Sequence, residues 1–170
     1  DEGHRAGHVI DEIRGMFRKD HRKAELVDVN ALISETLLLI GHETQTSRIL
    51  VRTSLKSDPP PRIVADRIQL QQVFLNLLLN AIEAMQSVTG KPRIISVSTD
   101  SDVAGLAITV EDSGPGIDPE NADKVFEMFF TTKPKGMGIG LAMCRSIVES
   151  HGGRIDLSHS PLGGCKFQIH

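Results

Sequence analysis

Residues 111–141 read EDSGPGIDPENADKVFEMFFTTKPKGMGIGL, and the rest of the chain is organised around this stretch. A carboxylate and two glycines stand within residues 112–116, and glycines recur at every second position of residues 136–140. Between them lie three phenylalanines, two threonines and three lysines. Glycine is the default residue where the backbone needs positive φ or touches a ligand. We therefore expect residues 126–138, here called the lid, to be a mobile segment that grips phosphate groups.

The composition is that of one ordinary globular domain, with room for a short appendage. The 170 residues are 39% hydrophobic and 24% charged, which is enough for a real core. A formal net charge of -3 and scattered basic residues argue against a nucleic-acid partner. Cys144 and Cys165 stand far apart without metal-ligand spacing, so reduced core thiols are favoured over a disulfide or a zinc site.

No segment has the pattern of a membrane span or a signal sequence. The longest apolar runs, residues 37–40 and 77–79, are far shorter than the roughly 20 residues that a spanning helix needs. No charged start leads into an apolar signal region. We expect a soluble, cytoplasmic piece, which leaves open a membrane anchor elsewhere in a longer parent protein.

Apolar periodicity predicts an alternation of helices and strands along the chain. The order is two helices, a strand pair, a helix, a hairpin, the lid, a helix and a final hairpin. This order favours an α+β fold with helices on one face of a mainly antiparallel sheet, the other face being solvated or docked. The predicted helices are 7–19, about 28–41 with Asp28 or Asn30 as its cap, 66–86 and 139–150; the predicted strands are 49–55, 62–65, 95–99, 106–110, 155–157 and 165–169.

The helix predicted from about residue 66 to 86 is apolar nearly all round, which indicates a buried helix. One stripe is polar, here called the amide stripe: Gln69, Gln72, Asn76, Asn80 and Glu83. At about 100° per residue these positions share an arc of roughly 80°. Buried amides need partners, either neighbouring backbone groups or a wet cavity that contains an ion. Taken alone, the pattern favours backbone partners.

Asp112 continues the inward face of the strand before it, because Ile108 and Val110 alternate with it. A carboxylate in that place is either a turn-former or an acceptor for a ligand. The glycines of residues 136–141 form neither a P-loop nor a dinucleotide fingerprint, because the residues that complete those motifs are missing. What remains is a loop that leads into a helix N-terminus, where backbone amides favour phosphate and where Lys133 and Lys135 add positive charge.

Four motifs, taken together and in this order, resemble the ATP-binding domain of sensor histidine kinases. They are NLLLNAIEA at residues 76–84, DSGPG at 112–116, FEMFFTTK at 126–133 and GMGIGL at 136–141. The resemblance extends over roughly residues 27–170. It implies the two-layer α/β sandwich of the gyrase, Hsp90, histidine kinase and MutL superfamily, with a mixed, mainly antiparallel sheet and a glycine-rich ATP lid.

The same resemblance implies ATP and Mg²⁺ as cofactors and assigns roles by position. Asp112 would accept the adenine amino group, Asn80 would ligate Mg²⁺, and Asn80 with Lys133 would support catalysis. The chain departs from the family at Glu83, where some members carry a cation, and at Cys165, where many have threonine. The residues implied at the ATP site are Asn76, Asn80, Glu83, Asp112, Gly114, Gly116, Ile117, Phe130, Thr131, Thr132, Lys133, Gly136, Met137, Gly138, Ile139, Gly140, Leu141 and Cys165.

Residues 1–23 resemble the end of the dimerisation and phosphoacceptor helix with its hinge, as in nitrogen- and oxygen-sensing kinases, and residues 24–170 the catalytic domain. The family's acceptor histidine is usually followed by an acidic residue and then a proline. His42 precedes Glu43 but lacks the proline, and His4 and His8 suit solvated helix positions. We therefore expect the acceptor histidine to lie outside this chain.

The function implied is transfer of the ATP γ-phosphoryl group to a histidine by the catalytic part of a protein-histidine kinase. The partners implied are its own dimerisation domain, a response regulator receiver domain and, in the full-length protein, a second copy of the chain. Two alternatives stay open. One is an ATPase switch of the same superfamily, whose members typically place a glutamate base where Asn76 stands; the other is a module that binds nucleotide without chemistry.

Overall fold

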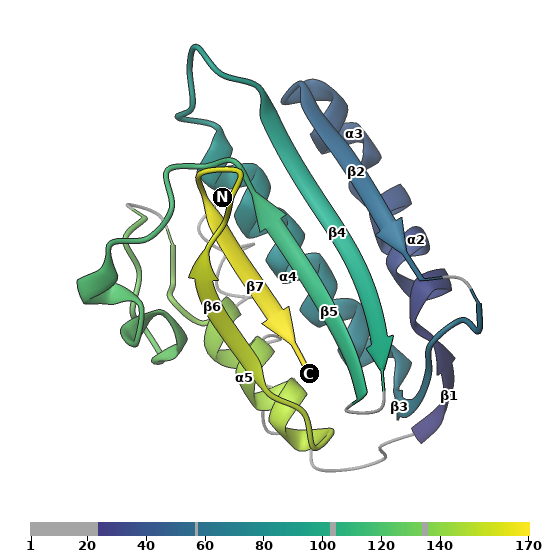
Figure 1. Ribbon diagram of the computed structural model, residues 1–170. Helices are drawn as coiled ribbons and strands as arrows, with labels where there is room; N and C mark the ends of the chain where they lie inside the picture. The colour runs from purple at the N-terminus through teal and green to yellow at the C-terminus, as the bar shows by residue number, and fades with distance from the viewer. Residues whose placement is uncertain (1–23, 57, 103–104, 134–135) are drawn as a thin grey trace, which may run out of the picture.

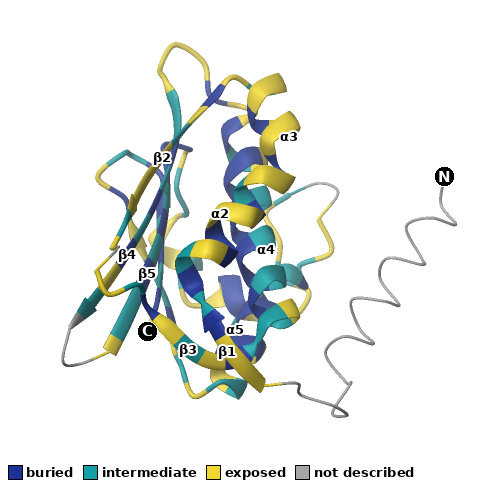
Figure 2. Ribbon diagram, turned by 90° about the vertical axis from the view of Figure 1, so that its right-hand side faces the viewer, coloured by how far each residue is buried: buried dark blue, intermediate teal, exposed yellow. Residues whose placement is uncertain are grey.

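The computed structural model describes residues 24–56, 58–102, 105–133 and 136–170. A five-stranded sheet forms one layer, and the helices form a second layer against one of its faces (Figures 1 and 2). A separate two-stranded sheet lies beside them. The strands are β1 (Ala24–Asp28), β2 (Ile49–Leu55), β3 (Arg62–Asp66), β4 (Arg93–Asp102), β5 (Gly105–Asp112), β6 (Ile155–His159) and β7 (Cys165–Ile169). The helices are α2 (Val29–Leu39), α3 (Gly41–Thr46), α4 (Arg67–Met85) and α5 (Gly140–Ser150), with short 3-10 turns η1 (Pro119–Asn121) and η2 (Lys124–Phe126).

The large sheet is mixed but mainly antiparallel, as the sequence predicts. Its strand order is β2-β4-β5-β7-β6, and only the β2–β4 pair is parallel. The predicted pairing of strands 49–55 and 62–65 is wrong: β2 pairs with β4 at the sheet edge, whereas β3 pairs antiparallel with β1. The sequence did not predict β1, because its residues AELVD carry two carboxylates and no clear alternation.

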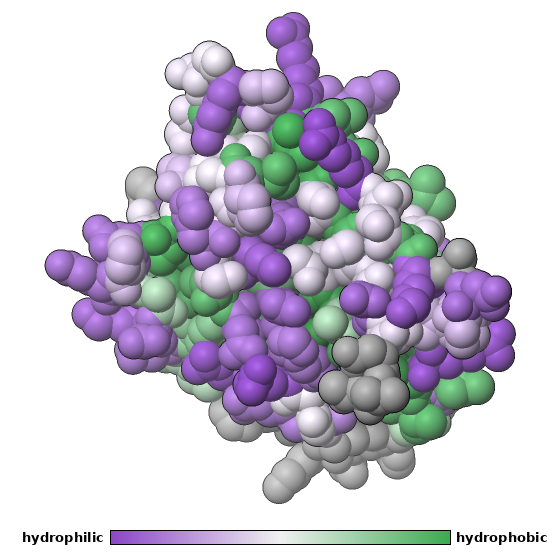
Figure 3. All heavy atoms as spheres, in the orientation of Figure 1, coloured by the Kyte–Doolittle hydropathy of each residue, from purple (hydrophilic) through white to green (hydrophobic). Residues whose placement is uncertain are grey.

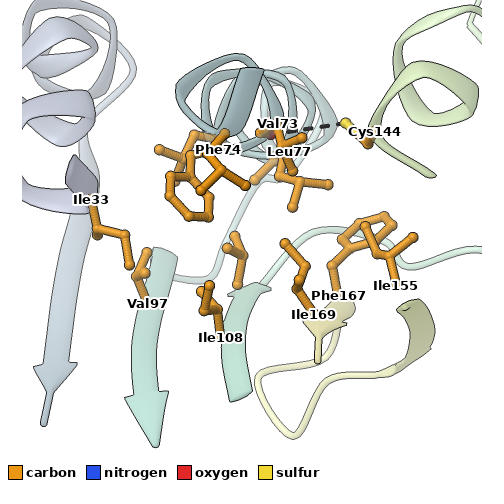
Figure 4. Close-up of a cluster of buried hydrophobic side chains, with 14 of the residues drawn as sticks. Ile33, Val73, Phe74, Leu77, Val97, Ile108, Cys144, Ile155, Phe167 and Ile169 are labelled. Atoms are coloured by element: carbon orange, nitrogen blue, oxygen red, sulfur yellow. Dashed lines mark hydrogen bonds between the residues drawn. The ribbon is translucent and has the colours of Figure 1, made fainter. Parts of the chain in front are cut away.

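Helix α4 lies behind the centre of the sheet, between α2 and α5, and forms the middle of the core (Figure 1). Its side chains Val73, Phe74, Leu77 and Leu78 are buried. Figure 4 shows Val73, Phe74 and Leu77 above the inward side chains of the strands, with Ile33 of α2 on one side and Cys144 of α5 on the other. Full burial of an aliphatic or aromatic side chain contributes about 1.5–3 kcal/mol. The helix that carries the amide stripe is therefore fixed by its other faces.

Side chains on the outer face of the sheet are mostly polar. Positions that alternate with the buried ones hold Ser96, Ser98, Thr109 and Gln168. Figure 3 views the molecule from this side and shows mainly hydrophilic and neutral side chains there, with scattered hydrophobic ones. One face packed and one face polar is the usual arrangement of a sheet with helices on a single side.

Two aspartates begin the helices that leave the small sheet. Asp28 caps α2 by accepting a hydrogen bond from Ala31 N (3.0 Å), as the sequence predicts. Asp66 caps α4 by accepting from the backbone nitrogens of Ile68 and Gln69 (3.0 and 3.1 Å). An aspartate side chain at this position satisfies amide groups that the first turn leaves free. The alternative cap Asn30 instead accepts a hydrogen bond from the Thr99 hydroxyl (2.9 Å).

The predicted helix over residues 7–19 and the hinge over residues 20–23 lie outside the described residues. Helix α2 ends close to the predicted stop at residue 41, but the sequence did not predict that the short α3 begins there. Within the described ranges, no helix combines the length and the hydrophobicity of a membrane-crossing segment.

His151 joins the end of α5 to the start of α4. Its Nε2 accepts a hydrogen bond from Asp66 N (3.0 Å), and its Nδ1 lies 2.8 Å from the Ile147 carbonyl oxygen. This pair of contacts requires the neutral tautomer with the proton on Nδ1, because a backbone N–H only donates. The ring therefore ties the two helices on either side of the candidate site to each other.

We predict that His151→Ala lowers the free energy of unfolding by about 1–3 kcal/mol, because it leaves the Asp66 amide without its partner. The matched control is His159→Ala on β6, whose side chain is exposed and which should change stability by less than about 0.5 kcal/mol. Chemical denaturation of both variants measures the difference. Equal losses would show that the Asp66 contact contributes nothing specific.

Candidate nucleotide-binding site

A cavity of about 600 Å³ lies between α4, the end of β5, the lid, α5 and the start of β7. Its size is within the range of about 300–1,000 Å³ that small-molecule sites occupy. Every residue that the family resemblance implies at the ATP site lines it, except Gly114. The sequence did not predict seven further lining residues: Leu79, Ala81, Ala84, Ser87, Pro115, Val125 and Phe167. Most of these are apolar residues that periodicity assigns to the core.

Asp112 forms one end of the cavity and is buried, with 3% of its surface exposed. It points inward, as strand parity predicts. Its Oδ1 accepts hydrogen bonds from Gly114 N (2.7 Å) and Cys165 N (3.3 Å). Burial raises the pKa of this carboxyl above its ordinary value, while the two backbone hydrogen bonds and the charge of Lys91 oppose the rise. An acceptor that is poorly hydrated and held in place is suited to a hydrogen-bond donor of a ligand.

Two glycines allow the backbone to approach Asp112 this closely. A Cβ on Gly164 would lie 2.0 Å from Asp112 Oδ1 and 2.6 Å from Gly114 N. A Cβ on Gly114 would lie 2.7 Å from the same Oδ1. Gly114 therefore contacts the carboxylate, although it does not itself line the cavity. Gly164 was not among the predicted site residues, although the resemblance implies its neighbour Cys165 there, because its close approach to Asp112 has no local signal in the sequence.

The lid side of the cavity ends at the N-terminus of α5. No side chain caps this helix at Ile139, so the backbone amides of its first turn are left without a side-chain acceptor. Gly138 has φ +68°, and a Cβ there would lie 2.5 Å from the backbone of Phe129 and Phe130. Its carbonyl accepts a hydrogen bond from Phe129 N (2.8 Å). A helix N-terminus of this kind, reached through glycine, favours an anionic group such as phosphate.

Three members of the amide stripe, Asn76, Asn80 and Glu83, face the cavity. The ammonium group of Lys133 lies 2.8 Å from Asn80 Oδ1 and 2.5 Å from Glu83 Oε2. Asn76 Nδ2 is buried beside the Cys144 thiol and has no hydrogen-bond partner of standard geometry. Buried amide groups are normally paired, so the backbone explanation that the sequence favours for the stripe fails at these positions.

The other two members of the stripe do not line the cavity. Gln72 Nε2 lies 3.4 Å from the sulfur of Met143 on α5, and Gln69 Oε1 is buried without a partner. The amide stripe therefore contacts α5 at Gln72 and lines the cavity from Asn76 to Glu83.

The three lid phenylalanines have three different environments. Phe126 is a core residue: its ring packs edge-on against Phe167, with centroids 6.3 Å apart, and Arg145 lies 4.0 Å above it. Phe130 lines the cavity. Phe129 is 70% exposed and has φ +67°, which is uncommon for a residue other than glycine.

Both cysteines are free and buried, as predicted. Burial raises the pKa of each thiol to about 12, so neither is a thiolate at neutral pH. Cys165 lines the cavity next to Asp112 and presents a weak donor there. Across the described ranges, histidine, cysteine and carboxylate side chains nowhere form a group of three that could hold a metal ion by themselves.

A family model described as histidine kinase-, DNA gyrase B- and HSP90-like ATPase matches residues 65–170, which include the whole cavity. The chain belongs to this ATPase family. The predicted resemblance is confirmed at this level, and so is the α+β fold.

Several relatives of this chain are named as sensor histidine kinases. ZraS of Escherichia coli strain K12 is 38% identical over 168 residues, which are 99% of this chain and 35% of the relative. The chain thus spans about a third of the length of such curated relatives. The catalytic domain of histidine kinase ThkA is 32% identical, with a TM-score of 0.76 over 86% of this chain and 93% of that one. ThkA in complex with response regulator protein TrrA is 29% identical, with a TM-score of 0.80 over 99% of this chain and 47% of that one.

We predict that Gly164→Ala destabilises the domain by about 2 kcal/mol or more, because the new methyl group has to displace the Asp112 carboxylate or the strand that carries it. The matched control is Gly41→Ala at the start of α3, where a Cβ meets nothing within 4 Å and alanine favours the helix. Thermal unfolding of the two variants tests the claim. An unchanged midpoint for Gly164→Ala would mean that Asp112 and β7 have more space than these contacts indicate.

Proposed function

We propose that this chain is the catalytic ATP-binding part of a two-component sensor histidine kinase, of the nitrogen- or oxygen-sensor-like type. One observation carries the proposal: a single cavity joins a buried carboxylate at one end to an uncapped helix N-terminus and Lys133 at the other. These features suit the two ends of ATP, since the adenine amino group is a donor and the phosphates are anions. The sensor-kinase relatives support the same assignment.

In this proposal Asp112 accepts a hydrogen bond from the adenine amino group. Ile117, Met137 and Leu141 supply apolar surface along the cavity, and Gly116 lets the chain turn beside Gly164. The first-turn amides of α5, beginning at Gly140, receive the phosphates, with Thr131, Thr132 and Lys133 on the lid side. Guanine carries a carbonyl where adenine carries its amino group, so Asp112 disfavours it.

The residues at the phosphate end fit a magnesium ion. Mg²⁺ binds oxygen ligands and is commonly held by one or two protein groups together with phosphates and water. Asn80 Oδ1 already accepts a cation in this structure, the ammonium of Lys133 at 2.8 Å. We assign Asn80 as the protein ligand, with Asn76 one turn before it. When bound, Mg²⁺ would neutralise phosphate charge, and the chain's own residues would position the γ-phosphoryl group.

The reaction proposed is transfer of that group to an imidazole nitrogen. A P–N bond forms, the bond between the γ-phosphorus and the bridging oxygen breaks, ADP leaves with the electron pair, and the imidazole N–H proton goes to solvent. Positioning and charge stabilisation supply most of such catalysis. The ATPase alternative is disfavoured, because position 76 carries an amide and not a carboxylate that could activate water.

The acceptor histidine is proposed to lie on a dimerisation domain outside this chain. Of the described histidines, at 42, 151, 159 and 170, none lines the cavity, and His42 lies on α3. We assign residues 1–23 to the end of the dimerisation helix and its hinge, and residues 24–170 to the catalytic domain. A homodimer, a response regulator as the next acceptor and a cytoplasmic location for this part complete the proposal. The complex of ThkA with TrrA supports the regulator as partner.

We predict that Asp112→Asn weakens ATP binding by about 1.5–3 kcal/mol while leaving the ligand-free protein at least as stable at pH 7. The raised pKa means that the folded state holds the proton more tightly than the unfolded chain. The stability from this group is present below its ordinary pKa of 3.8 and is lost as the pH rises through the raised value. At neutral pH this carboxyl group therefore opposes folding, whereas an amide, which does not titrate, makes no such contribution.

Calorimetric titration with ATP and GTP, together with thermal unfolding, checks both parts. Asp123→Asn is the control, since Asp123 is exposed and its side chain caps nothing. Equal affinity of the unmodified chain for the two nucleotides would remove Asp112 from the adenine role.

We predict that the chain with Mg²⁺ and ATP binds nucleotide yet gains almost no acid-labile phosphate. A separately prepared dimerisation domain should then become labelled at its acceptor histidine, at a rate that depends on its concentration. The same domain with that histidine changed to alanine is the control. Nucleotide binding without labelling of the domain would favour the non-catalytic module, and phosphohistidine at His42 would place the acceptor inside the chain.

A further inference from the structure

Lys133 is the residue that joins the lid to α4. Among the described residues, the hydrogen bonds and the ion pair that connect the lid to this helix all start at its ammonium group, which contacts Asn80 and Glu83. Asn80 and Glu83 are three residues apart, so they lie on one face of α4. Among the described residues, the polar contacts of the lid with α4 thus come from one side chain, whose ammonium group is shared by two oxygens.

The lid itself is shaped so that Lys133 reaches this position. The Thr131 hydroxyl accepts a hydrogen bond from Lys133 N (3.0 Å), and the Lys133 carbonyl accepts one from Gly136 N (3.2 Å). A Cβ on Gly136 would lie 2.5 Å from the Thr131 hydroxyl, so this local turn needs glycine there. The backbone around Lys133 is therefore constrained, while its side chain is 37% exposed and able to change partner.

From these contacts we infer that Glu83 is a positioning residue that competes with nucleotide phosphates for Lys133. In the structure the carboxylate of Glu83 holds Lys133 beside Asn80 Oδ1, the oxygen assigned to the magnesium ion. The two cations exclude each other from that oxygen, because they carry charge of the same sign. Binding of a magnesium nucleotide therefore transfers Lys133 from Glu83 to the phosphates, and the lid changes its partner from α4 to the ligand.

Glu83 thus has a different role from the contact with ATP that the family resemblance implies. A carboxylate near a triphosphate cannot bind it, since both are anions. It can hold the cation that will bind the phosphates and so set how readily the lid leaves α4. The identity of the ligand rests on the proposed function, but the contact between Lys133 and Glu83 is seen in the structure itself.

The first test needs no nucleotide. Glu83→Gln keeps the shape of the side chain and removes its charge, so amide hydrogen exchange in residues 129–133 and 136–138 of the ligand-free protein should become about two- to fivefold faster, the range expected for a partly exposed ion pair. Glu127→Gln removes an equal charge from an exposed lid position that does not contact Lys133, and its exchange should stay unchanged. Equal exchange in Glu83→Gln and the unmodified chain would overturn the inference.

The second test separates competition for Lys133 from plain repulsion. Calorimetry with ATP in the presence of a chelator should show binding that is about two- to fivefold tighter for Glu83→Gln than for the unmodified chain. The gain should vanish in the Lys133→Met background, because there is then no cation to release. A gain of the same size in that background would show that Glu83 only repels phosphate and would overturn the positioning role. Absence of any ATP binding would refute the proposed function. The exchange result would still decide whether Glu83 holds Lys133 in place.

Discussion

The structure depends on one constraint: a carboxylate, Asp112, is buried at the end of the central strand and still has to accept hydrogen bonds. Removal of an ionisable group from water opposes folding unless backbone donors compensate. Those donors are the amides of Gly114 and Cys165, one on the turn after β5 and one on the neighbouring strand β7. Both amides reach the carboxylate only because residues 114 and 164 lack a Cβ. The pairing of β5 with β7 and the shape of the cavity around Asp112 therefore depend on the same contacts.

The cavity combines two kinds of support. Asp112, Asn76 and Asn80 belong to a strand and a helix that the core fixes, since the remaining faces of α4 are buried against the sheet, α2 and α5. Among the described lid residues, Phe126 is buried in the core beside Phe167 and Arg145, and Phe130 packs against the core from the cavity side. A site built in this way keeps Asp112, Asn76 and Asn80 in place while the lid side is free to change its contacts.

Sequence patterns predicted most of the fold because the core elements are strongly periodic, as in the buried α4 and the alternating β5 and β7. They also predicted the inward direction of Asp112. They failed at β1, which has no apolar alternation. They also failed for the pairing partners of β2 and β3, because pairing depends on contacts between residues far apart in the sequence. Gly164 was missed for the same reason, because its role exists only once β7 lies beside Asp112. The contact of Lys133 with Glu83 joins residues 50 apart and has no local signal.

The order of strands in the large sheet has a consequence for how this domain tolerates change. β5 and β7 are neighbours, yet the chain between them contains the lid and α5. Closing such an excursion costs entropy that grows only with the logarithm of its length, about 0.6 kcal/mol for each doubling. The stability of the sheet therefore depends only weakly on how many residues the lid contains. Insertions and deletions in the lid can therefore change its contacts with a ligand without changing the fold around Asp112.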